Sequence, residues 1–459
     1  MRVLIVSANF VQTPYPVYPL GAATAAELAR RQGCETRLLD LLAESGFSSY
    51  DPEFLKAAVR EYRPDCVGLS LRNLESLDAS EAEDGWGLDL ARRIAADIRS
   101  VSAAPLFLGG AGFSLMPETV LRQVGAEYGL AGEGETALPA FLARLAAGRA
   151  RLGLQPAPEA CGRQASAYDR KLTRAYAERG GLIGVQTKRG CPLRCLYCSY
   201  PLLEGRRIRP RPAEEVIDDI ARLAADIEEP HIAFADAVFN DPAGHFRELL
   251  AALVSSGLKV RWTAFFQPAE FAPGDLELFK ASGLSGLEFG VDGAADATLA
   301  GLGKPFDFAL VRRLQKQCAE AAVASACYFI FGGPGETRAT VEEGIGNIES
   351  LEGCVAFISA GLSIYPRTPL HELAVREGLL EAGEEMTRPV WYYSPLIDPA
   401  ELHARLRQAF DGKRDRLFPP GRAQESARVL RLMGHRGILW DTLIGAGRRG
   451  ERRGHALFG

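Results

Sequence analysis

The chain has 459 residues, of which 47% are hydrophobic and 24% charged, and its net charge is −5. This length predicts two or three domains, each with its own core, and the composition is that of a soluble enzyme. The acidic balance argues against general nucleic-acid binding, and no stretch approaches the roughly 20 apolar residues of a membrane span. Nine cysteines without a regular framework, and a first segment without a cleavable signal pattern, predict a cytoplasmic protein.

Residues 1–150 alternate strand-like apolar runs with stretches of helical period. Strands are expected at residues 3–6, 35–39, 66–71 and 105–108, and helices at 22–32, 51–61, 88–100, 118–124 and 138–145. This alternation predicts an open, mostly parallel sheet whose ligands bind beyond the carboxyl ends of its strands.

Small and polar residues follow those strand ends. They are Arg72 and Asn73 after the third strand, Gly109, Gly110, Gly112 and Ser114 after the fourth, and Gly132, Glu133 and Gly134 after the fifth. Closely spaced glycines let a backbone approach a large ligand, although a tight turn explains any one of these loops about as well. The first strand is not followed by Gly-x-Gly-x-x-Gly, so NAD is not expected, and the absence of Gly-x4-Gly-Lys-Ser/Thr excludes a P-loop.

Three cysteines, Cys191, Cys195 and Cys198, form a C-x3-C-x2-C motif. Soft thiolates select iron–sulfur or zinc sites, and three of them can each hold one iron of a cubane cluster. The fourth iron then stays open to a small molecule, which is typical of a catalytic cluster. The alternative is a structural zinc knuckle, but such a site needs a fourth Cys or His, and neither occurs between Cys198 and His231.

Strands and helices alternate again after the cysteine motif. Strands are expected at residues 184–187, 231–234, 260–265, 286–289, 327–331 and 356–362, with helical segments between them. Six such units predict a partial TIM-like barrel with its chemistry at the carboxyl ends of the strands.

The cysteine motif, with Tyr197 before its third cysteine, resembles the signature of the radical S-adenosylmethionine (SAM) superfamily. The turn Gly332-Gly333-Pro334-Gly335-Glu336-Thr337 is similar to the family's Gly-x-Pro-Gly-Glu-Thr turn. This resemblance implies a [4Fe-4S] cluster whose open iron binds the amino and carboxylate groups of SAM, and whose electron cleaves the sulfonium.

The resemblance also implies SAM contacts for several residues, Tyr197 among them. Asp236 occupies the position of a Gly-Gly-Glu-like turn from which this chain departs, so only the position transfers. Glu288 resembles the acidic residue that holds the SAM ribose or amino group, with a salt bridge inside the barrel as the alternative. Gly332, Gly333 and Glu336 would lie against the adenine and methionine portions, unless the turn is purely structural.

The series Pro19-Leu20-Gly21, residues 64–70, residues 109–114 and residues 132–136 resembles the cobalamin-binding domain fused ahead of many radical SAM enzymes. The first histidine of the chain is His231, so no histidine of this domain can ligate cobalt from below. Arg72 and Asn73 are the candidates for that lower face. The alternative for Arg72 is a solvated side chain or a pair with Glu75.

Four further segments carry basic or aromatic residues. Lys188 and Arg189 either neutralise the charge of the cluster or of SAM, or are solvated. The loop 301–304 is interpreted as structural, and residues 391–393 either line a substrate cavity or pack the tail. The basic run 448–454 is interpreted as a solvated end, with attraction to an anionic substrate or membrane surface as the alternative.

The resemblance therefore implies an α/β protein with four parts: a Rossmann-like cobalamin-binding domain at 1–150, a linker at 151–180, a partial (β/α)6 TIM-like radical SAM barrel at 181–385, and a small, mostly helical C-terminal region at 386–459. The implied activity is methyl transfer to an unactivated carbon, or to phosphorus, of a small-molecule, natural-product or lipid-type substrate. An external electron donor such as flavodoxin or ferredoxin would reduce the cluster. The alternatives are a radical oxidoreductase or cyclase, and a non-catalytic carrier of cobalamin or the cluster.

Overall fold

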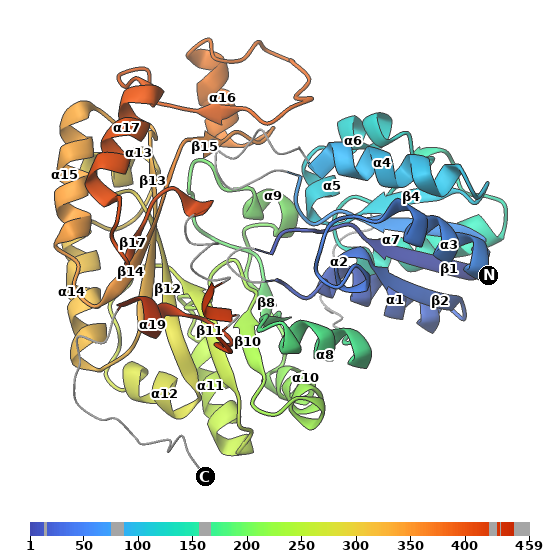
Figure 1. Cartoon of the computed structure of the whole chain (residues 1–459), viewed down its shortest axis with the longest axis horizontal. Helices are drawn as coiled ribbons and strands as arrows, with labels where there is room; N and C mark the ends of the chain where they lie inside the picture. Colours follow the sequence, from blue (N-terminus) through green and yellow to red (C-terminus); the bar gives the residue numbers. More distant parts are fainter. Residues whose placement is uncertain (13–15, 75–86, 156–166, 422–428, 432, 445–459) are drawn as a thin grey trace.

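The computed structural model describes residues 1–12, 16–74, 87–155, 167–421, 429–431 and 433–444. Two α/β units lie side by side, and the segment that carries the cysteine motif runs between them (Figure 1). Among the described residues, no helix is both long and apolar enough to span a bilayer. The basic run 448–454 and part of the predicted linker, residues 156–166, lie outside the described residues.

The N-terminal unit is built on a six-stranded parallel sheet of order β2-β1-β3-β4-β5-β6. Its strands are β1 (Arg2–Ser7), β2 (Glu35–Asp40), β3 (Cys66–Ser70), β4 (Leu106–Gly109), β5 (Tyr128–Gly129) and β6 (Gly153–Leu154). Its helices are α1 (Leu20–Arg31), α2 (Leu41–Glu44), α3 (Pro52–Tyr62), α4 (Gly87–Arg99), α5 (Ala111–Leu115), α6 (Pro117–Val124) and α7 (Gly134–Ala146). The predicted parallel sheet is therefore present, and β6 extends it into the segment predicted to be a linker.

Alternation along β1 explains why helices cover both faces of this sheet. Val3 and Ile5 pack in one core with α1 and α7, whereas Leu4 and Val6 pack in another with α3, α4 and α6. Successive side chains of a strand point to opposite faces, so a strand that is apolar at every position must be covered twice.

The second unit has a seven-stranded parallel sheet of order β17-β14-β13-β12-β11-β10-β7. The strands are β7 (Ile183–Val185), β10 (His231–Phe234), β11 (Arg261–Phe266), β12 (Leu284–Asp292), β13 (Ser325–Phe331), β14 (Cys354–Ala360) and β17 (Arg416–Leu417). Six of them are the predicted barrel strands. The seventh, β17, comes from the C-terminal region that was predicted to be mostly helical.

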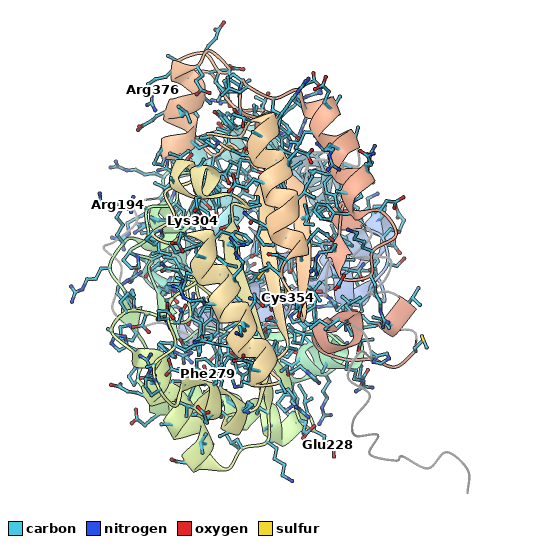
Figure 2. All side chains as sticks on the ribbon, turned by 90° about the vertical axis from the view of Figure 1, so that its left-hand side faces the viewer. Arg194, Glu228, Phe279, Lys304, Cys354 and Arg376 are labelled. Carbon is cyan, nitrogen blue, oxygen red and sulfur yellow. The ribbon has the colours of Figure 1, made fainter. Side chains whose placement is uncertain are left out.

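Helices cover the outer face of this sheet, as Figure 2 shows for α14 and α15. The helices are α8 (Arg170–Glu178), α10 (Ala213–Asp226), α11 (His245–Ser256), α12 (Asp275–Ala281), α13 (Asp296–Gly301), α14 (Phe308–Glu320) and α15 (Arg338–Glu349). Their apolar faces form the largest core with the outward side chains of the strands, such as Trp262, Phe289 and Phe329, all about 1% exposed. The inner face carries Tyr328 and Phe357, whose rings stack at 5.0 Å.

The segment that follows β14 wraps around the barrel. Its helices are α16 (Pro369–Arg376), α17 (Pro399–Phe410) and α19 (Trp440–Ile444), and its strands β15 (Leu362–Ser363) and β16 (Trp391–Tyr392) form an antiparallel pair. Trp440 of α19 is 2% exposed, packs edge-on against Phe357 at 4.9 Å and lies over Gly286, where a Cβ would meet its ring at 3.0 Å. The tail thus closes the amino-terminal end of the inner barrel face.

Replacing Trp440 with Ala should lower the free energy of unfolding by about 3–5 kcal/mol, because truncating a buried large side chain loses its burial and leaves a cavity. Urea unfolding measures this change. Met433→Ala, in the same tail but 72% exposed, is the matched control and should change stability by less than about 0.5 kcal/mol. Equal stability of the two variants would show that the tail does not pack in the barrel.

Candidate functional site

The cysteine motif lies in a loop at the carboxyl end of β7. It follows β8 (Lys188–Arg189), which pairs with β9 (Arg209–Pro210), and precedes α9 (Tyr200–Glu204). Cys191 is buried, Cys195 and Cys198 are partly buried, and all three are free thiols. Burial is the main cause that raises the pKa of Cys191 and Cys198, and the charges of the neighbouring thiols add to it. The pKa of Cys198 rises to about 12. The three sulfurs therefore lie close enough to repel one another when ionised, which suits binding to a cationic iron centre.

The cysteine loop lacks a fourth ligand for the zinc alternative. No further Cys or His occurs in the sequence between Cys198 and His231, so the loop offers three of the four ligands that a structural zinc ion needs. Three thiols suffice for a cubane that keeps one iron open.

Two other strand-end segments stack against the cysteine loop. Leu196 N donates to Leu302 O at 3.0 Å, and a Cβ at Gly303 would lie 2.8 Å from Arg194 O. A Cβ at Gly301 would lie 2.1 Å from Pro334 O. The cysteine loop, the loop 301–304 and the turn 332–336 are thus packed backbone against backbone, and Figure 2 shows Arg194 and Lys304 at the same end of the barrel.

The predicted turn 332–336 is held from inside. Glu336 is 2% exposed and accepts from Gly332 N at 3.1 Å and from Thr340 Oγ1 at 2.6 Å. Burial raises the pKa of its carboxyl group. Thr337 caps α15, and its partner in the capping box is Thr340. The Glu336 side chain is therefore committed to the turn, and only the backbone of the turn is left for a ligand.

The tail covers the same turn. Gly332 has φ +90°, and a Cβ there would lie 2.8 Å from the ring of Tyr393. Ser394 donates its backbone N–H to Gly332 O at 2.7 Å and its hydroxyl to Glu336 O at 2.8 Å. At Gly333 a Cβ would lie 3.2 Å from Leu302. The run 391–393 thus packs on the predicted cofactor turn.

The structure gives Asp236 a different role from a ligand contact. Its buried carboxylate accepts from the backbone N–H groups of Thr187 at 2.8 Å and Lys188 at 3.2 Å, and pairs with Lys188 Nζ at 3.1 Å. Lys188 is 2% exposed, so the predicted solvated side chain is wrong, and its ammonium also lies 3.6 Å from Asp241. Together Asp236 and Lys188 anchor the strand that leads into the cysteine loop.

Glu288 lies on the inner face of β12 and is 1% exposed. Its carboxyl accepts from Thr263 Oγ1 at 2.8 Å and from the Tyr328 hydroxyl at 2.6 Å. These hydroxyl partners replace the salt bridge that sequence reasoning gave as the alternative. Burial raises the pKa of Glu288, because removal from water disfavours the charged carboxylate, and the hydrogen bonds from Tyr328 and Thr263 oppose that shift.

Sequence reasoning missed one network beside the cluster loop. Tyr197 donates its hydroxyl to Asp292, and Lys304 forms an ion pair with the same carboxylate. Asp292 adopts φ +65° at the end of β12, which is unusual for a residue with a side chain. Lys304 follows two glycines, a pattern that indicated only a structural loop.

The glycines after β4 serve backbone packing. Gly110 has φ +101°, and a Cβ there would lie 2.4 Å from Leu71 O, while a Cβ at Gly112 would lie 3.1 Å from Arg72 O. Gly109 is less crowded, with Leu130 O at 3.6 Å. Because Gly110 and Gly112 have no side chain, the start of α5 can pack directly on the backbone of the loop after β3.

Ser114 joins two of the predicted loops. Its hydroxyl donates to Gly110 O at 2.8 Å and accepts from Gly132 N at 2.9 Å. Gly132 and Gly134 have open space where a Cβ would stand. These two positions are therefore the ones at which a large ligand could approach the backbone.

Glu133 and its neighbour Glu135 face the second unit. Arg189 binds Glu135 through two hydrogen bonds, at 2.6 and 3.1 Å, and lies 3.3 Å from Glu133. Arg209 also forms a two-pronged pair with Glu133. All four side chains are at most 20% exposed. These ion pairs, called the clasp below, thus bind the loop after β5 to the antiparallel pair β8–β9, which flanks the cysteine loop.

Arg72 and Asn73 lie at the carboxyl end of β3. Arg72 is exposed, and its charge acts on Tyr176 of α8 and on Tyr200 of α9. It therefore faces the second unit. Its predicted alternative partner, Glu75, lies outside the described residues.

Further contacts close the interface between the two units. Arg367 of the second unit donates to two carbonyl groups of the first, Ser114 O at 3.4 Å and Leu115 O at 3.3 Å. Three residues further on, Leu370 N donates to Leu196 O of the cysteine loop, in its own unit, at 3.0 Å. One apolar core includes Leu71 and Phe113 from the first unit together with Leu302, Leu362 and Leu370 from the second. The strand-end surfaces of the two units therefore face each other.

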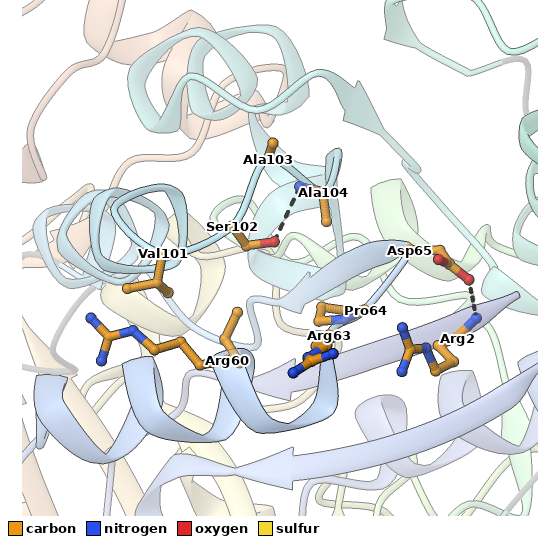
Figure 3. A pocket seen from close by; sticks show the side chains of 10 residues that line it. Arg2, Arg60, Arg63, Pro64, Asp65, Val101, Ser102, Ala103 and Ala104 are labelled. Atoms are coloured by element: carbon orange, nitrogen blue, oxygen red, sulfur yellow. Dashed lines mark hydrogen bonds between the residues drawn. The ribbon is translucent and has the colours of Figure 1, made fainter.

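A separate cavity of about 490 Å³ lies at the opposite edge of the N-terminal sheet (Figure 3). It is lined by Arg2, Arg60, Arg63 and residues 101–104, at the amino ends of β1, β3 and β4. In an open parallel sheet, ligands bind at the carboxyl ends of the strands. This cavity is therefore not part of the candidate site.

Replacing Arg189 with Met should lower the free energy of unfolding by about 3 kcal/mol, because it leaves the buried Glu135 carboxylate without its partner. Urea unfolding is the measurement. Arg92→Met is the control: Arg92 pairs with Asp89 in water, both more than half exposed, so its loss should cost less than about 1 kcal/mol. Indistinguishable variants would mean that the clasp contributes nothing to stability.

Glu288→Gln should stabilise the protein at neutral pH. The folded chain holds the Glu288 proton more tightly than the unfolded chain, whose pKa is near the ordinary 4.5, so the wild type loses stability as the pH rises above that value. The advantage of the Gln variant should vanish at lower pH. Denaturant unfolding across pH measures it.

Glu127→Gln provides the control of opposite sign. Although burial opposes it, hydrogen bonds from Leu106 N and from Arg99 lower the pKa of Glu127. That carboxylate contributes stability above its unfolded pKa, so its Gln variant should be destabilised at neutral pH. A shift of the same sign in both variants would contradict the assignment.

The chain was compared with known families and proteins. A B12 binding domain model matches residues 6–142, and a Radical SAM superfamily model matches residues 185–345. A tryptophan 2-C-methyltransferase from Streptomyces laurentii is 25% identical over 79% of this chain and 73% of its own. A cytidylyl-2-hydroxyethylphosphonate methyltransferase from Streptomyces wedmorensis is 24% identical over 89% of this chain and 88% of its own.

The fold has a counterpart among solved structures. The radical SAM methyltransferase TsrM from Kitasatospora setae superposes with a TM-score of 0.83 over 96% of this chain and 97% of its own, at 24% identity. The two family models follow one another in the predicted order, and the fold class is confirmed along nearly the whole chain. The protein belongs to the radical SAM enzymes that carry an N-terminal B12-binding domain.

Proposed function

We propose that the protein transfers a methyl group to an unactivated carbon, or to phosphorus, of a small-molecule substrate. The observation that carries this proposal is the facing of the two strand-end surfaces, in which Leu370 N bonds Leu196 O of the cysteine loop and Arg367 bonds Ser114 O of the first unit. A cobalamin held by one surface and a SAM held by the other would then meet one substrate.

Cys191, Cys195 and Cys198 are the proposed ligands of a [4Fe-4S] cluster, because one loop carries three free thiols in the C-x3-C-x2-C spacing. When bound, the cluster, SAM and cobalamin supply the electron, the methyl group and the radical chemistry. The chain itself binds, orients and excludes water. Reduction requires an external donor of the flavodoxin or ferredoxin kind.

For SAM, the proposed contacts combine backbone and side chains at the barrel mouth. The backbones of Gly332 and Gly333 line the site, while Glu336 fixes their turn and Asp236 fixes the approach to the cysteine loop. Tyr197 presents its ring beside the cluster loop. Glu288, held by two hydroxyl groups, is the carboxyl placed to meet the ribose or the amino group from inside the barrel.

For cobalamin, the proposed contacts are the loops after β3, β4 and β5. Gly132 and Gly134 offer open backbone, Ser114 ties their loop to Gly110, and Arg72 with Asn73 lies toward the second unit. Glycines crowded by backbone, Gly110 and Gly112, would shape the site without touching the ligand. Glu133 is occupied by Arg209 and closes the rim.

The substrate class stays open in this proposal. The relatives are named for tryptophan and for a cytidylyl phosphonate, which differ in charge and size. Their shared feature is methyl transfer to a small molecule. This shared feature supports methyl transfer as the reaction type, and the proposal names no individual substrate.

Bound cobalamin should lack a protein imidazole, because no histidine precedes His231 in the chain, and His231 lies at the amino end of β10, away from the strand-end site. The EPR spectrum of the cobalt(II) form should therefore show no strong nitrogen superhyperfine triplet. A clear triplet from the protein, or no uptake of cobalamin, would contradict the assignment of the first unit.

The reconstituted, reduced enzyme should convert SAM to S-adenosylhomocysteine in step with a product that is one CH2 heavier than its substrate. Candidate small molecules are screened anaerobically by mass spectrometry. The matched control replaces Cys191, Cys195 and Cys198 with Ala, which should abolish both iron binding and product. A product that is oxidised or cyclised, without added mass, would favour the oxidoreductase alternative; full iron content in the triple variant would remove the cluster site.

A further inference from the structure

Lys304 places a buried positive charge directly behind the cysteine loop. Its side chain is 6% exposed, and its ammonium forms an ion pair with Asp292, whose side chain is 12% exposed. The same ammonium lies 3.3 Å from both Gly290 O and the Tyr197 hydroxyl. It also lies 5.6 Å from the centre of the Tyr197 ring. Removing such a charge from water is costly, so each of its partners matters.

The backbone holds this charge in place at both ends. Gly303, with φ +73°, lets the loop press against Arg194 O, and Lys304 N donates to Leu299 O at 2.9 Å. On the other side, Asp292 keeps φ +65° despite having a side chain. Unusual backbone of this kind persists only where the surroundings enforce it. The ion pair is therefore a built feature and not a flexible surface contact.

The ammonium lies against the cysteine loop. It is 3.3 Å from the hydroxyl of Tyr197, a Cβ at the neighbouring Gly303 would lie 3.9 Å from Cys195 Cα, and the charge of Lys304 acts on all three cysteines. The potential of an iron–sulfur centre depends on the charges near it and on hydrogen bonds to its sulfurs. In a site screened this little by solvent, a fixed cation acts strongly.

We propose that Lys304 raises the reduction potential of the cluster through its buried positive charge, and that the paired Asp292, which carries the opposite charge, limits this effect. The inference rests on the proposed cluster site. Adding an electron makes the cluster more negative, so the Lys304 cation stabilises the reduced form. The Asp292 carboxylate partly cancels that cation and opposes reduction.

The two members of the pair therefore predict shifts in opposite directions. In Lys304→Met or Lys304→Gln, the cation is lost and Asp292 is left uncompensated, so the midpoint potential should become more negative. In Asp292→Asn the cation is left uncompensated and the potential should become more positive. Lys304→Arg should stay close to the wild type, because the charge is kept.

The experiment uses the full chain, reconstituted anaerobically with iron and sulfide and without SAM, and follows the reduced cluster by EPR during a redox titration. Lys316→Met is the control, because Lys316 is 78% exposed on α14 and pairs with Glu320 in water; its potential should match the wild type. Iron content is measured on every variant, so that loss of the cluster is seen separately from a shift in its potential.

Each result of the titration either supports or contradicts the proposal. Opposite shifts for the Lys304 neutral variants and for Asp292→Asn support the proposal, as does iron loss confined to the neutral variants while Lys304→Arg keeps its cluster. Unchanged potentials at full iron content, shifts of the same sign in both members, or equal iron loss in all Lys304 variants would overturn it, because packing and not charge would then explain the residue. A wild-type chain that assembles no cluster would instead remove the proposed cluster site itself.

Discussion

The clasp between Arg189 and Glu135 is the interaction on which the geometry of the site depends. Arg189 belongs to the ribbon that carries the cysteine loop, and Glu135 begins the helix after β5 in the other unit. A two-pronged guanidinium–carboxylate pair fixes orientation as well as distance. Because it joins the two halves at the level of the strand ends, a cofactor on either half would have one defined position relative to the other.

A second anchor works inside the barrel unit. Asp236, at the end of β10, collects two backbone N–H groups and the buried Lys188 ammonium from the strand before the cysteines. The cysteine loop is thus held from the barrel by Asp236, from the first unit by Glu135, and from the neighbouring loop by Leu302 O. A loop without regular structure gains the rigidity that a cluster site needs from these three directions.

The sequence by itself determined the class and order of the two units. Alternating apolar and helical periods identified the strands of both sheets, because parallel strands covered on both faces must be apolar throughout. The cysteine spacing and the Gly-x-Pro-Gly-Glu-Thr turn identified the cluster loop and its partner turn, since both are local and their residues are adjacent. Within the two large sheets, β5, β6 and β17 received no residue range from the sequence, because strands of two residues carry too few side chains to show a period.

Only the tertiary structure decided which side chains are free to act. Asp236 and Glu336 are acids at strand ends, as a ligand site requires, yet both are occupied by neighbouring N–H and hydroxyl groups. Lys304 was overlooked because Tyr197 of the cysteine loop, which it contacts, lies 107 residues away in the chain. Sequence patterns record local period and spacing, whereas pairs between loops depend on how two sheets bring their strand ends together.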